Sequence, residues 1–230
     1  MNEQLLKLYS SKWSGLSGAI TTILEDDTLD IKPANPLLLY INKEEDYKIA
    51  DIRLMVFGQE TNSWYDERAT IKAVRYHYDN FFNGDKCWGY GGQFWNGVSR
   101  FLSCLQSKYP DKRIRLIWNN IVKIGKKSEK GFPPDYIYEI ERELFHVIPD
   151  ELQILKPNVV LFLTGPNYDS IIADNFGELK HEALSIFPER ELSEVSLNGV
   201  DFAFRTYHPN YLWRNGIDKY FETIIENIKL

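Results

Sequence analysis

Four short apolar runs stand out along the chain, at residues 54–58, 114–122, 158–165 and 201–208. Each run is nearly continuous in hydrophobic residues, as in "LMVFG" and "NVVLFLTG". Such runs are typical of strands that are covered on both faces of a parallel sheet. The segment 35–41, "NPLLLYI", is also apolar and could be an extra strand or an extended segment that packs on the sheet.

Segments with helical spacing of their apolar residues lie before, between and after these runs. They cover residues 2–25, 94–109, 135–156, 166–174 and 210–229. Pro149 is expected to break one of these helices or to begin a new one within it. Strands that alternate with helices predict an α/β fold, a three-layer α/β/α sandwich with a four-stranded, mainly parallel sheet and right-handed crossovers.

Composition is that of an ordinary globular protein. The chain has 230 residues, of which 43% are hydrophobic and 26% are charged. No run approaches the ~20 apolar residues of a membrane span, and the first residues lack the apolar centre of a signal peptide. We therefore expect a single domain over residues 1–230, with a helical extension over about 1–50, in the cytoplasm and with no membrane partner.

Cysteine number and charge restrict the possible sites. Cys87 and Cys104 are the only cysteines, so this chain alone cannot form a four-cysteine zinc or iron–sulfur site. The net charge of −6 argues against an extended basic surface for nucleic acid but allows a local one. The lysine-rich stretch "KIGKKSEKG", residues 123–131, is either a solvated loop or such a local patch.

The first predicted strand ends in the stretch "GQETNSW", which begins at Gly58. Glycine there permits a tight turn or the close approach of another segment. A carboxylate, Glu60, comes next, followed by the amide of Asn62 and the ring of Trp64. The same stretch could instead cap a helix, since any of residues 61–63 would serve as an N-cap.

Polar side chains also mark the second and fourth strands. In "WNNIVK" the amides of Asn119 and Asn120 interrupt an apolar run, and buried amides are costly unless they are paired. They could form a structural network in the core, or an amide could read the edge of a base because it both donates and accepts hydrogen bonds. The fourth strand ends in His208, and Pro209 stiffens the exit of the chain.

Parallel strands place their carboxyl ends along one edge of a sheet, where open α/β sheets bind ligands. Glu60, Asn120 and His208 are therefore expected to converge there. A carboxylate, an amide and an imidazole at one edge favour a hydrolytic site.

The same residues resemble motifs of the uracil-DNA glycosylase superfamily. "GQETN" is similar to its first motif, GQDPY in one branch and GEAPG in another, and "NIVK" (120–123) is similar to NVVK of the iron–sulfur branch. "ELQILKPNVVLFLTG" (151–165) resembles ELxxLKPxVIVxLG, and "TYHPNYLWRN" (206–215) resembles TYHPSYLLRN. "GGQFWNGVSRFL" (91–102) resembles GxPFVGxxGxxL. The motifs keep the family's order and cover about residues 53–228.

Four positions depart from the family pattern. Ile124 stands where the iron–sulfur branch has a cluster cysteine, so no cluster is expected. Glu60 replaces the aspartate of GQDPY and Thr61 replaces its proline, while Asn210 replaces the serine that follows the His-Pro pair. The chain is thus closest to the iron–sulfur branch but lacks its cluster cysteines.

The resemblance implies a role for each matching residue. Glu60 would orient or activate water near the sugar carbon, and His208 would donate a hydrogen bond to the departing base. Asn120 would read the edge of a flipped base, with Phe94 or Trp95 stacked on it. Further substrate contacts would come from Gly58, Gln59, Asn62 and Trp64.

The segment after His208 would contact DNA through Asn210, Leu212, Trp213 and Arg214. Leu212 or Trp213 would act as a wedge in the duplex, and Arg214 would bind phosphate. The resemblance implies hydrolysis of the N-glycosidic bond of uracil, or of another damaged or deaminated base in DNA, with no metal or cofactor. The alternative is a catalytically inactive or redirected relative that binds nucleic acid or a nucleoside-like ligand.

Overall fold

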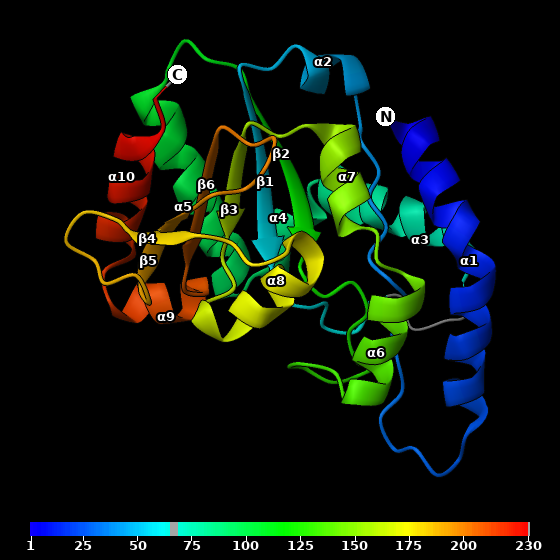
Figure 1. Cartoon of the computed structure of the whole chain (residues 1–230). Helices are drawn as coiled ribbons and strands as arrows, with labels where there is room; N and C mark the ends of the chain where they lie inside the picture. Colours follow the sequence, from blue (N-terminus) through cyan, green and yellow to red (C-terminus); the bar gives the residue numbers. More distant parts are fainter. Residues whose placement is uncertain (65–68, 230) are drawn as a thin grey trace.

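The computed structural model describes residues 1–64 and 69–229 and is built on a six-stranded sheet of order β2-β1-β3-β6-β5-β4 (Figure 1). The strands are β1 (Ile52–Gly58), β2 (Ile114–Asn120), β3 (Val159–Phe162), β4 (His181–Ala183), β5 (Leu192–Val195) and β6 (Phe202–Thr206). Strands β2, β1, β3 and β6 are parallel to one another, whereas β5 and β4 continue the sheet in antiparallel fashion.

The four apolar runs form the parallel part of the sheet, so the α/β class is confirmed, but the sheet is larger than predicted. The sequence pattern does not indicate β4 and β5, which have only three and four residues. The residues of β4 are partly or fully exposed. A short strand at the edge of a sheet lacks the continuous apolar run that marks a central strand.

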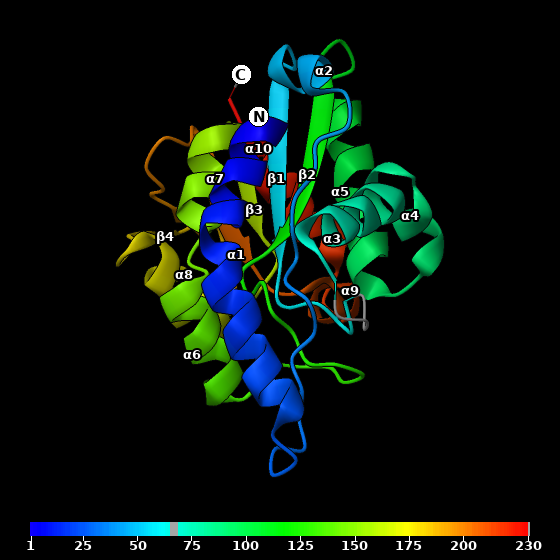
Figure 2. The ribbon, with the colours of Figure 1, turned by 90° about the vertical axis from the view of Figure 1, so that its right-hand side faces the viewer.

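Helices cover both faces of the sheet (Figures 1 and 2). One face carries α1 (Asn2–Glu25), α6 (Asp135–Leu144), α7 (Ile148–Leu155) and α8 (Asp169–Phe176), which follows the short helix η2 (Pro166–Tyr168). The other carries α5 (Gln93–Lys108), α9 (Pro209–Arg214) and α10 (Ile217–Asn227). The remaining helices are α2 (Glu44–Lys48), α3 (Ile71–Tyr78), η1 (Asp79–Asn83) and α4 (Lys86–Tyr90). None of the described helices is long and apolar enough to cross a membrane.

Alternate residues of β1 belong to two separate hydrophobic clusters. Met55 and Phe57 pack with residues of α1, α6 and α7, whereas Leu54 and Val56 pack with residues of α5 and α10. Successive side chains of a strand point to opposite faces of its sheet. A strand buried on both faces therefore needs apolar residues at every position, which explains the continuous run in the sequence.

Several predicted helices are divided in the structure. Pro149 lies in the first turn of α7, so it begins a new helix after α6, one of the two expected outcomes. Gly216, with a φ of 77°, separates α9 from α10. Residues 35–41 form no strand; they are an extended segment in which the backbone N–H of Leu37 donates to the carbonyl of Lys123 across 2.8 Å.

Candidate functional site

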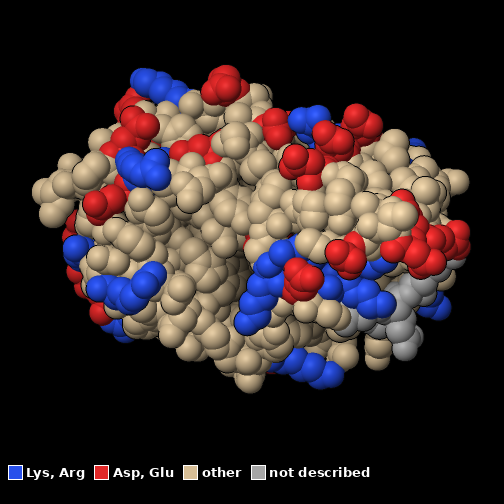
Figure 3. Space-filling model, turned by 90° about the horizontal axis from the view of Figure 1, so that it is seen from below, with Lys and Arg blue, Asp and Glu red and all other residues tan. Residues whose placement is uncertain are grey.

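The carboxyl ends of β1, β2, β3 and β6 lie at one edge of the sheet, the lower end in Figure 1. Gly58 and Asn120, the last residues of β1 and β2, are paired in the register of these two strands. Figure 3 views this end of the molecule and shows a hollow in it, with basic side chains along part of its rim. The carboxyl ends of the parallel strands therefore point toward an end of the molecule that has a concave surface.

Gly58, Phe94 and Asn120 meet at this edge. A Cβ atom added at Gly58 would lie 2.5 Å from Oδ1 of Asn120 and 3.2 Å from the ring of Phe94, so any side chain there would displace both. The ring of Phe94, in the first turn of α5, stacks on that of His208 with their centroids 5.7 Å apart and their planes at 24°. The structure thus brings four of the predicted site residues together from four distant segments.

His208 precedes α9 and acts as its N-cap. Its Nδ1 accepts a hydrogen bond from the backbone N–H of Asn210 across 3.1 Å. Burial lowers the pKa of His208 to about 4, so the ring is neutral at pH 7. Because Nδ1 accepts a hydrogen bond, the proton of the neutral ring is on Nε2. His208 therefore offers a neutral Nε2–H donor.

The side chain of Asn120 is held in one orientation. Its Oδ1 accepts a hydrogen bond from Nε1 of Trp118 across 3.1 Å. An indole N–H can only donate, so the oxygen and not the nitrogen of the amide must face it. The NH₂ group of Asn120 has no hydrogen-bond partner among the described residues. Asn120 can therefore offer a hydrogen-bond donor to a ligand.

Asn119 belongs to a buried hydrogen-bond network. A structural network in the core was one of the two roles predicted for the neighbouring amides of Asn119 and Asn120. Its Nδ2 donates to Glu151 across 2.8 Å, and its Oδ1 accepts from Nζ of Lys123 across 2.7 Å. Lys123 and Glu151 form an ion pair at 2.9 Å, with both side chains 0% exposed. Tyr9 of α1 also donates to Glu151 across 2.6 Å. The Oδ1 of Asn119 in turn accepts from the backbone N–H of Asn120, so the network holds the end of β2.

Glu60 lies at the same edge, but its described contacts lead toward β3. Its Oε2 accepts a hydrogen bond from the hydroxyl of Tyr168 in η2. Burial raises the pKa of Glu60, and the hydrogen bond from Tyr168, the charge of Lys126 and the backbone N–H of Gly131 partly offset this effect. The carboxylate is thus oriented by Tyr168 and by the loop that follows β2.

Two predicted substrate contacts lie in the core instead. The exposed fractions of Trp64 and Trp95 are 5% and 6%. Both rings pack edge-on against Trp118, at centroid distances of 5.4 and 5.0 Å. Their large apolar surfaces are used to fill the space between β2 and the helices beside it. Two residues were candidates for stacking on a base. The ring of Phe94 lies next to His208, whereas Trp95 is buried and packs edge-on against Phe94.

The remaining residues of the first motif also have definite positions. The side-chain amide of Gln59 donates to the carbonyl of Thr164 across 2.8 Å and so joins the ends of β1 and β3. Asn62 is exposed and forms an isolated bridge with Lys126. Among the described residues, none of 61–63 caps a helix, and the next described helix, α3, is capped by Thr70.

The predicted DNA contacts divide between the surface and the core. Leu212 is 0% exposed and belongs to the hydrophobic cluster formed with α5 and α10, so it is not available as a wedge. It lies one helical turn after the buried Pro209, on the inner face of α9. Asn210 and Arg214 are exposed, and 40% of Trp213 is exposed. These three residues remain candidates for contact with DNA.

Tyr168 and Trp118 were not predicted from the sequence. Tyr168 follows β3 at its carboxyl end, in "GPNY", so the rule that selected the other strand ends would have selected it as well. Trp118 lies two residues before Asn120 and therefore on the same face of β2. Among the described residues, no cluster of three or more His, Cys, Asp or Glu side chains could hold a metal ion.

No protein-family model matches this sequence, and no curated protein matches it.

Proposed function

We propose that this protein is a DNA glycosylase-like enzyme that hydrolyses the N-glycosidic bond of uracil or of another damaged or deaminated base in DNA. The observation that carries the proposal is the arrangement of His208, Asn120 and Phe94 around Gly58. Two hydrogen-bond donors and an aromatic ring at one edge of the sheet suit a flat heterocycle with carbonyl oxygens. The sequence resemblance to the uracil-DNA glycosylase superfamily points to the same reaction.

His208 would act on the departing base. When the N-glycosidic bond breaks, negative charge develops on the base, and a donor already in place stabilises that charge. The pKa of about 4 keeps the imidazole neutral, and the hydrogen bond from Asn210 to Nδ1 leaves Nε2–H for the base. In this role His208 donates a hydrogen bond and need not transfer a proton.

Asn120 and Phe94 would bind the base before the bond breaks. The free NH₂ group of Asn120 would donate to a carbonyl oxygen of the base, since its own oxygen is occupied by Trp118. The ring of Phe94 would provide an apolar surface for the heterocycle. Gly58 allows these two side chains to approach the backbone at the end of β1.

Glu60 would hold the water that attacks the sugar carbon. A carboxylate can do so only while it is ionised and within about 3 Å of the water. The hydrogen bond from Tyr168 to Oε2 fixes the orientation of the carboxylate, and a carboxylate that accepts one or two hydrogen bonds keeps further acceptor sites for water. Tyr168 is thus a positioning residue, and the negative charge of Glu60 would also stabilise a cationic sugar.

Basic side chains near the hollow would contact the phosphates. Lys127 and Lys130, in the loop after β2, are exposed, and so is Arg214 on α9. Such a local patch can bind a phosphate backbone although the net charge of the chain is −6. Affinity for DNA should then fall steeply as the salt concentration rises, because phosphate contacts release counterions.

The test is a strand-cleavage assay for abasic sites. Oligonucleotides that carry uracil, hypoxanthine, xanthine or a thymine mispair are incubated with the protein and then cleaved at any abasic site formed. The proposal expects cleavage of at least one substrate by the wild type and a much lower rate with His208→Ala. Cleavage that His208→Ala leaves unchanged, or no cleavage of any substrate, would contradict it.

One observation favours the second candidate function, a redirected or inactive relative that binds nucleic acid or a nucleoside-like ligand. The described contacts of Glu60 lead to Tyr168 and the loop after β2, not to the group around His208. Salt-sensitive binding of DNA without excision would support this alternative.

A further inference from the structure

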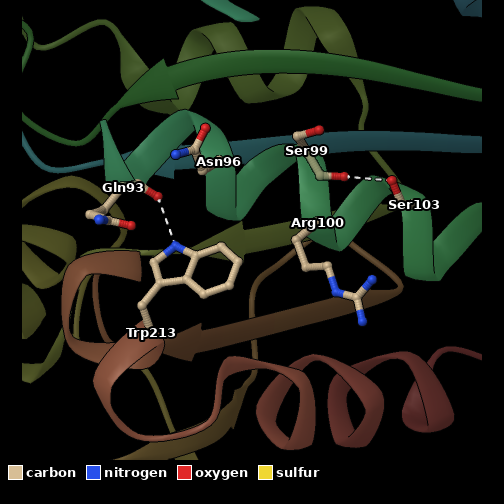
Figure 4. A pocket seen from close by; sticks show the side chains of 6 residues that line it. All are labelled: Gln93, Asn96, Ser99, Arg100, Ser103 and Trp213. Atoms are coloured by element: carbon tan, nitrogen blue, oxygen red, sulfur yellow. Dashed lines mark hydrogen bonds between the residues drawn. The ribbon is translucent and has the colours of Figure 1, made fainter. Parts of the chain in front are cut away.

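A groove along the outer side of α5 lies beside the candidate site and takes no part in the chemistry proposed above. Its volume is about 510 Å³, within the usual range for small-molecule sites. Figure 4 shows the residues that line it, which are Gln93, Asn96, Ser99, Arg100, Ser103 and Trp213. Five of them come from α5 and one from α9.

The indole of Trp213 forms the aromatic part of the groove. Its Nε1 donates to the backbone carbonyl of Gln93 across 3.4 Å, which holds the ring beside the start of α5 (Figure 4). Even so, 40% of the residue is exposed. An exposed indole whose one polar atom is already bound presents mainly an apolar ring surface, suited to stacking on another flat ring.

The part of α5 that lines the groove carries neutral hydrogen-bonding groups. The amides of Gln93 and Asn96 and the hydroxyl of Ser99 have no side-chain hydrogen-bond partner among the described residues. Each of these groups can both donate and accept. They could therefore bind the polar edge of a ring that stacks on Trp213.

The one charged side chain in the lining is already paired. Arg100 makes two hydrogen bonds to the carboxylate of Asp218, at 2.7 and 3.0 Å. This bidentate pairing balances its charge and fixes its orientation. The groove is thus polar but close to neutral, which favours a heterocycle over a phosphate or another free anion.

The groove is connected to the candidate site through two elements. Gln93 precedes Phe94, whose ring stacks on His208. Trp213 lies on α9, the helix that begins directly after His208. A single strand of nucleic acid that extends from the candidate site across α9 would reach the groove. The exposed Arg214 on α9 would lie beside it.

We propose that this groove binds one unstacked nucleobase of a single-stranded nucleic-acid segment, with the base stacked on Trp213 and its edge bonded to Gln93, Asn96 or Ser99. The inference rests on the nucleic-acid binding in the proposed function, but not on excision. Stacking of a base on an aromatic ring depends little on sequence. The subsite would therefore hold the strand regardless of which base occupies the candidate site.

The test measures the affinity of a short labelled thymidine oligonucleotide by fluorescence anisotropy at low salt. Trp213→Ala should weaken binding by about tenfold, the loss of one stacked base, and Trp213→Phe should weaken it less because a ring remains. The matched control is Trp88→Ala, since Trp88 has a similar exposed fraction of 37% but does not line the groove. Melting curves show that each variant is folded.

A second oligonucleotide with abasic residues keeps the phosphates and removes the bases. The wild type should bind it more weakly, and Trp213→Ala should cause little further loss on it. No binding by the wild type, an unchanged affinity of Trp213→Ala, or an equal loss on both oligonucleotides would overturn the subsite. Base-dependent binding that requires Trp213, in a preparation that excises no base, would support the subsite and contradict the proposed excision.

Discussion

The indole Nε1 of Trp118 donates a hydrogen bond to Oδ1 of Asn120 across 3.1 Å, within β2. The two residues lie on the same face of the strand, and Trp118 is held by a cluster of aromatic rings that includes Trp64 and Trp95. When the oxygen and the NH₂ group of an amide are both free, the amide can bind a ligand that has a hydrogen-bond donor next to an acceptor. The amide of Asn120 is restricted to its donor edge, so it should select a ligand group that accepts.

Trp118→Phe should relax this selection. The substitution keeps a ring in the cluster but frees Oδ1 of Asn120 to accept a hydrogen bond from a ligand. The ratio of kcat/KM for a base with a carbonyl group to that for a base with an amino group at the same place should fall by up to about tenfold, the value of one neutral hydrogen bond. Tyr78→Phe is the control, because Tyr78 packs on Trp118 and donates to its backbone carbonyl but does not bond Asn120. An unchanged ratio would show that Trp118 does not limit what Asn120 recognises.

His208→Ala should slow the chemical step more than it weakens substrate binding. A donor to a developing anion contributes roughly 3–4 kcal/mol, so the single-turnover rate should fall on the order of a hundredfold or more. His181→Ala, on β4, is the control, since His181 contacts Ser193 and lies outside the candidate site. A normal single-turnover rate for His208→Ala would remove this residue from the mechanism.

The excision rate, measured against pH, should show no step near pH 6.5, where an ordinary histidine titrates. Burial lowers the pKa of His208 to about 4, so the ring is neutral, with its proton on Nε2, at pH values well above 4. Glu60, whose pKa burial raises, must lose its proton to hold water, so activity should fall as the pH drops through the pKa of Glu60. Rates measured from about pH 4 to pH 8 test this; a step near pH 6.5 that His208→Ala abolishes would contradict it.

Glu60→Gln should lower the excision rate on the order of a hundredfold or more, while DNA affinity and melting temperature stay nearly unchanged. The amide keeps the shape of the side chain but loses its charge. Tyr168→Phe is the companion variant: it removes a hydrogen bond that lowers the pKa of Glu60, so the acid limb of the rate profile should move to higher pH. Full activity of Glu60→Gln would exclude the carboxylate from catalysis.

Lys123→Met should destabilise the fold by about 3–5 kcal/mol, because it leaves the carboxylate of Glu151 buried without its partner. The double variant Lys123→Met/Glu151→Gln should recover part of the loss, since no buried charge remains and the amide oxygen can still accept from Tyr9 or Asn119. Urea unfolding of the wild type, both single variants and the double variant measures the coupling. If the double variant loses as much stability as the two single variants together, the two charges do not stabilise each other.

The sequence alone was sufficient to predict the central strands and the edge of the sheet where the candidate site residues meet. Strands such as β1 and β3, buried on both faces, must be apolar at nearly every position, and this leaves a continuous run that needs no other information to find. The carboxyl ends of parallel strands share one edge, so the neighbourhood of Gly58, Asn120 and His208 also followed from the order of the strands.

Only the tertiary structure decided which side chains face that edge. Trp64, Trp95 and Leu212 belong to residue types that can line a site or fill a core, and the packing of α3, α5, α9 and α10 places all three in the core. Asn119 and Asn120 are identical neighbours, yet the alternation of the strand directs one to the ion pair of Lys123 and Glu151 and the other to the candidate site. Glu60 was predicted from the sequence, but its partner Tyr168 is more than a hundred residues away. Contacts between distant segments depend on the whole arrangement of the layers, and local patterns of apolar and polar residues do not contain that information.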